Sequence, residues 1–173
     1  MSENINNEKV SGLALPALGL AVQQLGQKET PMGSNSGPMV DKYLLSVGLS
    51  PGYAWCQAFV YWCYASVAAK QNVRCPVIRT AGVKECWNKV AKSQKIMAAD
   101  ARRNPGMIAP GDQFILLFGN GSGHTGLVER TENDVIFTIE GNSNEDGSRE
   151  GYEVVRHTRK LADKALLGFI KYN

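Results

Sequence analysis

The sequence predicts an α+β fold, with helices in its first half and an antiparallel sheet in its second. Apolar residues recur at helical spacing up to about residue 92, and short strand-like segments follow from residue 114. Few residues separate these segments, which favours antiparallel pairing. The chain has 173 residues, of which 43% are hydrophobic and 20% charged, so we expect one globular domain over residues 1–173.

Four helices are expected in the first half. The third begins near Trp55 and carries an apolar stripe at the i, i+3, i+4, i+7 spacing that marks a buried helix face. That stripe consists of Cys56, Phe59, Val60, Cys63 and Val67. The other helices are expected at residues 13–25, 38–47 and 81–92, with structured loops at 28–38 and 102–110 where Gly, Pro, Ser and Asn gather.

Five strands are expected in the second half, separated by turn residues. They are predicted at residues 114–118, 125–129, 135–140, 152–157 and 166–172. The turns fall at residues 119–123, 131–133 and 144–147. Helices followed by strands in this way predict a helical layer packed on an antiparallel sheet.

The charge pattern excludes some partners. The net charge is +3 and no run of Lys or Arg interleaves with aromatic residues, so we expect no nucleic-acid binding. Residues 1–9 are polar without a basic segment, and Pro16 interrupts the short apolar stretch at 13–22. We therefore expect no secretory signal, no membrane association and synthesis in the cytoplasm.

Cys56 follows the Pro51-Gly52 turn at the start of the third helix. A helix N-terminus stabilises negative charge, so this position suits a nucleophilic thiolate. The alternative is that Cys56 is the first core residue of the stripe, as Cys63 is expected to be. No C-x-x-C pair occurs and we expect free thiols, with Cys75–Cys86 as the one disulfide considered. The cysteine and histidine spacings do not suit zinc.

His124 opens a predicted strand after Gly121-Ser122-Gly123, whereas His157 lies among basic residues and is expected at the surface. A three-residue hairpin loop at 131–133 would pair His124 directly with Glu140. A carboxylate there would orient the imidazole as the third member of a triad does. Asn142 would point the same way if the strand continued. Cys56, His124 and Glu140 then form a nucleophile, base and orienting group for attack on an amide.

Several short motifs occur together in a specific order. They are Gly26–Pro31, Ser34–Gly37, Pro51–Val60 with its Trp55-Cys56 pair, Pro110-Gly111-Asp112, Gly123-His124-Thr125-Gly126 and Ile139–Asn142. In these motifs the chain resembles the CHAP family, the cysteine- and histidine-dependent amidohydrolases and peptidases, and the broader NlpC-type group. The resemblance implies a papain-like layout, with the nucleophile at the start of a central helix against the sheet.

The resemblance also implies a function. Its catalytic set would map onto Cys56, His124, Glu140 and Asn142, acting on peptidoglycan as a muramoyl-L-alanine amidase or a peptide endopeptidase. Some relatives bind calcium, but no Asp/Asn-rich loop precedes Cys56 and residues 142–147 lack calcium-loop spacing, so we expect no metal and no cofactor. We expect a monomer without a separate wall-binding module.

The biological setting is left open between a phage lysin and a translocated antibacterial effector with a cognate immunity protein. Either would reach the cell wall by lysis or by non-classical export. We expect Tyr53, Trp55 and Gln57 to contact substrate, with Tyr53 and Gln57 also candidates for a second oxyanion donor. The loops at residues 29–37 and 93–109 are expected to wall the groove. The alternative function is a non-catalytic module of the same fold that binds wall glycan or a protein.

Overall fold

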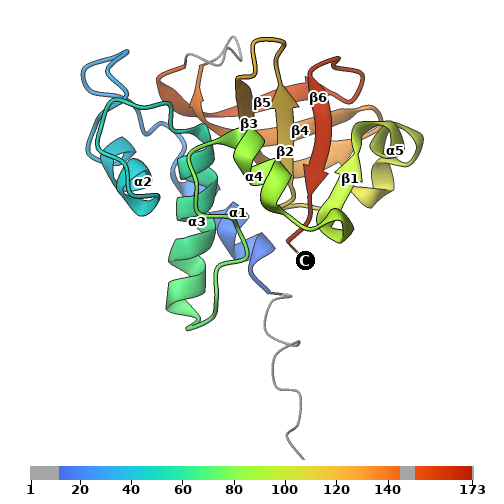
Figure 1. Ribbon diagram of the computed structural model, residues 1–173, viewed down its shortest axis with the longest axis horizontal. Helices are drawn as coiled ribbons and strands as arrows, with labels where there is room; N and C mark the ends of the chain where they lie inside the picture. The colour runs from blue at the N-terminus through green and yellow to red at the C-terminus, as the bar shows by residue number, and fades with distance from the viewer. Residues whose placement is uncertain (1–11, 145–150, 173) are drawn as a thin grey trace, which may run out of the picture.

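The computed structural model describes residues 12–144 and 151–172 and confirms the α+β fold. In Figure 1 the helices α1 to α3 lie together beside one half of a curved sheet, and α5 lies at the other end of that sheet. The helices are α1 (Ala14–Gln23), α2 (Val40–Ser46), α3 (Cys56–Lys70), α4 (Val83–Lys89) and α5 (Ala98–Arg103). The strands are β1 (Lys95–Met97), β2 (Gln113–Leu117), β3 (Gly123–Glu132), β4 (Val135–Ser143), β5 (Glu153–Lys160) and β6 (Leu166–Ile170).

The strands form one antiparallel sheet in the order β1-β6-β2-β3-β4-β5. Successive residues of a strand point to opposite faces, and each face has its own hydrophobic cluster. Leu127 packs in the cluster that includes α1 and α3, whereas its neighbour Val128 packs in the cluster that includes α5. The sheet is therefore buried on both sides, and β3 and β4 lie inside it between other strands.

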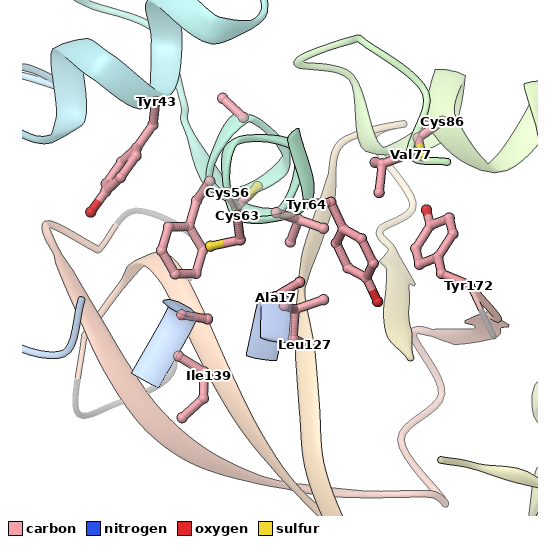
Figure 2. Packing of buried hydrophobic residues seen from close by; sticks show 14 of the residues in the cluster. Ala17, Tyr43, Cys56, Cys63, Tyr64, Val77, Cys86, Leu127, Ile139 and Tyr172 are labelled. Atoms are coloured by element: carbon pink, nitrogen blue, oxygen red, sulfur yellow. The ribbon is translucent and has the colours of Figure 1, made fainter. Parts of the chain in front are cut away.

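Aromatic residues hold the start of α3 against α2. Trp55 stacks on Tyr43 with ring centroids 5.6 Å apart, and Phe59 meets the same tyrosine edge-on at 5.2 Å. Figure 2 shows Tyr43 on one side of α3 and Tyr64 with Tyr172 on the other. Because such rings bury large apolar areas in fixed geometry, the first turn of α3 is held firmly in place.

Several sequence predictions need correction, and the strand β1 was not predicted. Residues 102–110 are not a plain loop, because α5 extends to Arg103 and a 3₁₀ turn, Pro105–Met107, follows. The β3–β4 loop has two residues, Asn133 and Asp134, rather than three, since Glu132 pairs with Val135. The predicted turn at 144–147 and the polar segment at 1–9 lie largely or wholly outside the described residues.

The four cysteines are free thiols, as predicted, so Cys75 and Cys86 form no disulfide. None of the helices within residues 12–144 and 151–172 is both long and apolar enough to cross a membrane.

Asp112 lies directly before β2, and its carboxyl group is buried. Its Oδ2 accepts the Ala109 N–H at 2.8 Å, but its buried Oδ1 has no hydrogen-bond partner among the described residues. Burial raises the pKa of Asp112 to about 6, against the lowering effects of the Ala109 bond and of Lys171. The folded state therefore favours the neutral acid, and the free energy of unfolding falls when Asp112 ionises.

Asp112→Asn is expected to stabilise the protein in a pH-dependent way. The unfolded carboxyl ionises near its ordinary pKa of 3.8 and the folded one near 6, so wild-type stability falls as pH rises between them. The variant should therefore gain up to about 2–3 kcal/mol relative to wild type on going from about pH 4 to about pH 7. Urea unfolding at both pH values measures this gain. The exposed control Asp134→Asn should show none, and an equal Asp112→Asn effect at both pH values would contradict the assignment.

Candidate active site

A β-bulge in β3 determines which residues of β4 lie on the same face of the sheet as His124. At the hairpin, Glu132 pairs with Val135 and Arg130 with Phe137; continued inward, that register would pair Leu127 with Glu140. The pairing shifts at Glu129, so that Val128 faces Thr138 and Leu127 faces Ile139. Opposed residues share a face of the sheet, and a shift of one residue reverses the face. The bulge therefore puts Glu140 on the same face as His124.

The predicted contact between His124 and Glu140 is present, although the predicted register was wrong. His124 Nε2 lies 2.7 Å from Glu140 Oε2. In the observed register Gly126, not His124, is opposite Glu140, and the imidazole reaches the carboxylate diagonally. A Cβ at Gly126 would lie 2.5 Å from the Ile139 carbonyl oxygen and 2.9 Å from Glu140 Cγ. The second glycine of the Gly-His-x-Gly motif therefore leaves room for this carboxylate.

Glu140 is wholly buried and is surrounded by donors. Arg159 holds it with two bonds, Nε to Oε1 and Nη2 to Oε2, both 2.6 Å long. The remaining bonds come from Thr138 Oγ1 to Oε1 at 2.6 Å and from Ser143 Oγ to Oε2 at 3.4 Å, besides that of His124. A bidentate arginine pair is strong and directional. Glu140 is thus fixed as an anion that accepts hydrogen bonds.

The charges of this pair are set by their surroundings. Burial raises the pKa of Glu140, but Arg159 and His124 outweigh it and hold that pKa well below its usual range. Burial lowers the pKa of His124, but the Cys56 thiol and the Glu140 carboxylate together raise it to about 9. The arrangement therefore favours the imidazolium form of His124. An ionised carboxylate only accepts, so Nε2 carries a proton in either state of the ring.

Cys56 is the first residue of α3 and is only 4% exposed. His124 Nδ1 is buried and makes no hydrogen bond within usual limits, and the Cys56 thiol lies near enough to raise the pKa of that ring. No side chain caps the helix and no acidic residue occupies its first turn. The free N–H groups of a helix start stabilise an anion. The thiol thus lies between a base and an electropositive helix end.

A cavity of about 210 Å³ opens onto Cys56. Its walls come from the loop before α3, the start of α4 and the β2–β3 loop. The lining residues are Ala54, Cys56, Ala81, Gly82, Val83, Lys84, Glu85, Gly121, Ser122 and Gly123. The residues that line this cavity therefore do not come from the loops at 29–37 and 93–109, which were expected to form the walls of the substrate groove. Residues 93–109 instead form β1 at the sheet edge, α5 and the 3₁₀ turn.

The three predicted substrate contacts are placed differently from one another. Tyr53 is 53% exposed beside the cavity-lining residue Ala54. Trp55 and Gln57 are fully buried, which corrects the expectation that their side chains contact substrate. The Trp55 indole N–H donates to Glu29 Oε1 at 2.9 Å, and Gln57 Oε1 accepts from Gln113 Nε2 at 2.7 Å. Through these buried hydrogen bonds, both side chains hold the start of α3 in place.

Asn142 is buried, but strand alternation does not align it with Glu140 and His124 as expected. Its backbone is left-handed, with φ at 55°, and the β4–β5 pairing is irregular between Glu140 and Ser143. The strand alternation that would align Asn142 with Glu140 therefore does not hold there. The hydrogen bond described for His124 joins Nε2 to Glu140, and Asn142 therefore stays a prediction as an orienting residue.

Sequence reasoning missed two supporting residues, Arg159 and Glu29. Arg159 belongs to the basic segment around His157, which was not predicted to contribute to the site, yet its side chain is only 11% exposed. Glu29 is buried and accepts both the Trp55 indole and the Asn35 N–H, tying the loop before α2 to the residue before Cys56. Across residues 12–144 and 151–172, no cluster of three or more His, Cys, Asp or Glu side chains could hold a metal ion.

The chain matches the CHAP domain model over residues 48–142, more than half of its length. The protein therefore belongs to the CHAP family. Two solved structures are similar: the crystal structure of Ly7917, at 18% identity and a TM-score of 0.47, and that of Ly7917 with the hydrolyzing product of MDP, at 20% and 0.48. Each alignment covers 92% of this chain, which spans 62% of the Ly7917 chain. No curated protein matched.

Proposed function

We propose that the protein is a cysteine hydrolase that cleaves an amide bond of peptidoglycan. The observation that carries this proposal is that His124 is next to both Cys56 and Glu140. Its Nε2 lies 2.7 Å from the buried carboxylate, its Nδ1 has no other described partner, and the thiol is close enough to raise the pKa of the ring. A nucleophile, its base and an orienting anion are the groups that covalent acyl transfer requires. Peptidoglycan as the source of the amide rests on membership of the CHAP family.

The reaction follows from these positions. With the proton of the Cys56 thiol held on His124 Nδ1, the thiolate sulfur attacks the amide carbonyl carbon, whose oxygen becomes negative. The Cys56 N–H, unpaired at the helix start, donates to that oxyanion. His124 then gives its proton to the leaving amine as the C–N bond breaks, which leaves a thioester. Water, deprotonated by His124, attacks the thioester and releases the acid and the free thiol.

Two settings suit this activity, lysis by a phage and delivery as an antibacterial effector. The bond is that of a muramoyl-L-alanine amidase or of an endopeptidase that cuts the stem peptide or cross-bridge. An effector would in addition be inhibited by an immunity protein of the producing cell. The chemistry at Cys56 is the same in each case.

The test is digestion of purified peptidoglycan followed by mass spectrometry of the released fragments. The proposal predicts new pairs of amine and carboxylate ends, and the fragment masses identify the bond. Binding to peptidoglycan without any released fragment would overturn the proposal and favour a non-catalytic module.

Arg159→Met is expected to lower kcat/KM about tenfold or more near neutral pH. Arg159 is the largest influence that holds down the pKa of Glu140, and it fixes both carboxylate oxygens. Without Arg159, Glu140 should take up a proton at higher pH, and the neutral acid would no longer stabilise the imidazolium. Removal of a residue that orients a functional side chain typically lowers activity about 10–100-fold. The acid limb of the kcat/KM profile should therefore move to higher pH.

Arg156→Met is the matched control, because Arg156 lies on the same strand and holds Glu129 with two bonds of 2.8 Å at an exposed site. It should leave the pH profile in place. Arg159→Lys keeps the charge but not the bidentate geometry and should fall between Arg159→Met and wild type. An unshifted acid limb in Arg159→Met would show that Arg159 serves the fold alone.

A further inference from the structure

We propose that Lys84 forms a carboxylate-binding subsite beside Cys56, so that the enzyme prefers substrates with a free carboxylate next to the scissile amide. This inference rests on the proposed function and adds the substrate class. Lys84 lies in the first turn of α4, is exposed and lines the cavity that also contains Cys56. A group bound to Lys84 is thus in the same cavity as the nucleophile.

The charge of this cavity is unbalanced. Two ionisable side chains other than Cys56 line it, Lys84 and Glu85. Glu85 is already neutralised, because Lys89 Nζ lies 2.6 Å from Oε1 and the Thr80 hydroxyl donates to Oε2. Lys84 makes no ion pair or hydrogen bond within the described ranges. An unpaired cation in a recess attracts a negative group of the ligand.

The other lining groups fit a peptide rather than a bulky apolar ligand. Ala54, Ala81, Gly82, Gly121 and Gly123 are small, so a chain can approach the backbone closely. The Ser122 hydroxyl and N–H are both turned toward Asn120 Oδ1, at 2.5 and 3.0 Å. These two Ser122 donors are therefore already used and are not available to a substrate carboxylate. Lys84 is the side chain of the cavity that can bind this carboxylate.

The test compares two peptidoglycan-derived peptides that differ only beside the scissile amide, where one has a carboxylate and the other a carboxamide. Wild type should cleave the carboxylate peptide about fivefold better in kcat/KM, as expected for a partly exposed charge pair. Lys84→Met should abolish this preference by slowing the carboxylate peptide alone, and Lys84→Glu should reverse it. Added salt should reduce the preference of wild type.

Lys92→Met is the matched control, since it removes one exposed lysine charge outside the cavity. It should keep the wild-type preference. Equal cleavage of both peptides by wild type, or a preference that survives in Lys84→Met, would overturn the carboxylate subsite and leave the proposed function standing. Cleavage of neither peptide by wild type, or cleavage that persists in Cys56→Ala, would overturn the proposed function and the subsite with it.

Discussion

Cys56→Ala is expected to abolish hydrolysis of peptidoglycan, with a loss in kcat of about a thousandfold or more. The variant removes the sulfur that forms the thioester, while the rest of the site stays in place. Cys56→Ser should be almost as inactive, because His124 must then deprotonate a much weaker acid. The rate of fragment release, measured by mass spectrometry under single-turnover conditions, gives the size of the loss.

Cys63→Ala is the control within the same helix. Cys63 lies two turns further along α3, is completely buried, and burial raises the pKa of its thiol well above the ordinary value. The variant leaves a small core cavity and should cost about 1 kcal/mol or more of stability but little activity. Comparable losses of activity in Cys63→Ala and Cys56→Ala would show that the cysteines act through packing and would contradict the nucleophile assignment.

His124→Ala should lower kcat/KM by about a hundred- to ten-thousandfold, the usual contribution of a general base. The imidazole holds the thiol proton and gives it to the leaving amine. Glu85, the carboxylate that lines the cavity beside Cys56, is already paired with Lys89. Wild-type activity should in addition fall as pH rises through about 9, where the pKa of His124 lies and the imidazolium loses its proton. The variant should lack this limb.

The second histidine of the chain provides the control. His157 lies on β5, and its Nδ1 bonds to the backbone of Thr158 rather than to the site. His157→Ala should keep wild-type kcat/KM and the alkaline limb. Retention of most activity by His124→Ala would remove His124 from the mechanism.

The helices and strands with strong periodic patterns could be predicted from the sequence, and the pairing of His124 with Glu140 could be predicted only in part. The expected three-residue loop without a bulge and the observed two-residue loop with a bulge at Glu129 shift the inner register by two residues. An even shift keeps the same side chains on the same face. The right pair of residues was therefore predicted from the wrong register.

Contacts between elements that are far apart in the sequence could not be predicted from local sequence patterns. Arg159 reaches Glu140 because β5 pairs with β4 so that Arg159 is opposite Ile136, and nothing in the basic segment around it reveals that register. Trp55 was expected at the surface of the site, yet its indole is used to hold Glu29, 26 residues earlier. The residue type alone does not show whether a polar side chain is buried or exposed. That depends on the packing of the folded chain.

Selective alkylation of the four thiols tests the central claim, that His124 activates Cys56, most directly. Exposure alone favours Cys75, which is partly exposed, over Cys56, which is 4% exposed. Burial raises the pKa of the Cys75 thiol, whereas Cys56 faces a base and a helix N-terminus. Limiting iodoacetamide near neutral pH, followed by peptide mass spectrometry, should therefore modify Cys56 first, in step with loss of activity, and His124→Ala should slow that reaction without affecting Cys75. Modification of Cys75 first, with a Cys56 rate that His124→Ala leaves unchanged, would contradict the activation of Cys56.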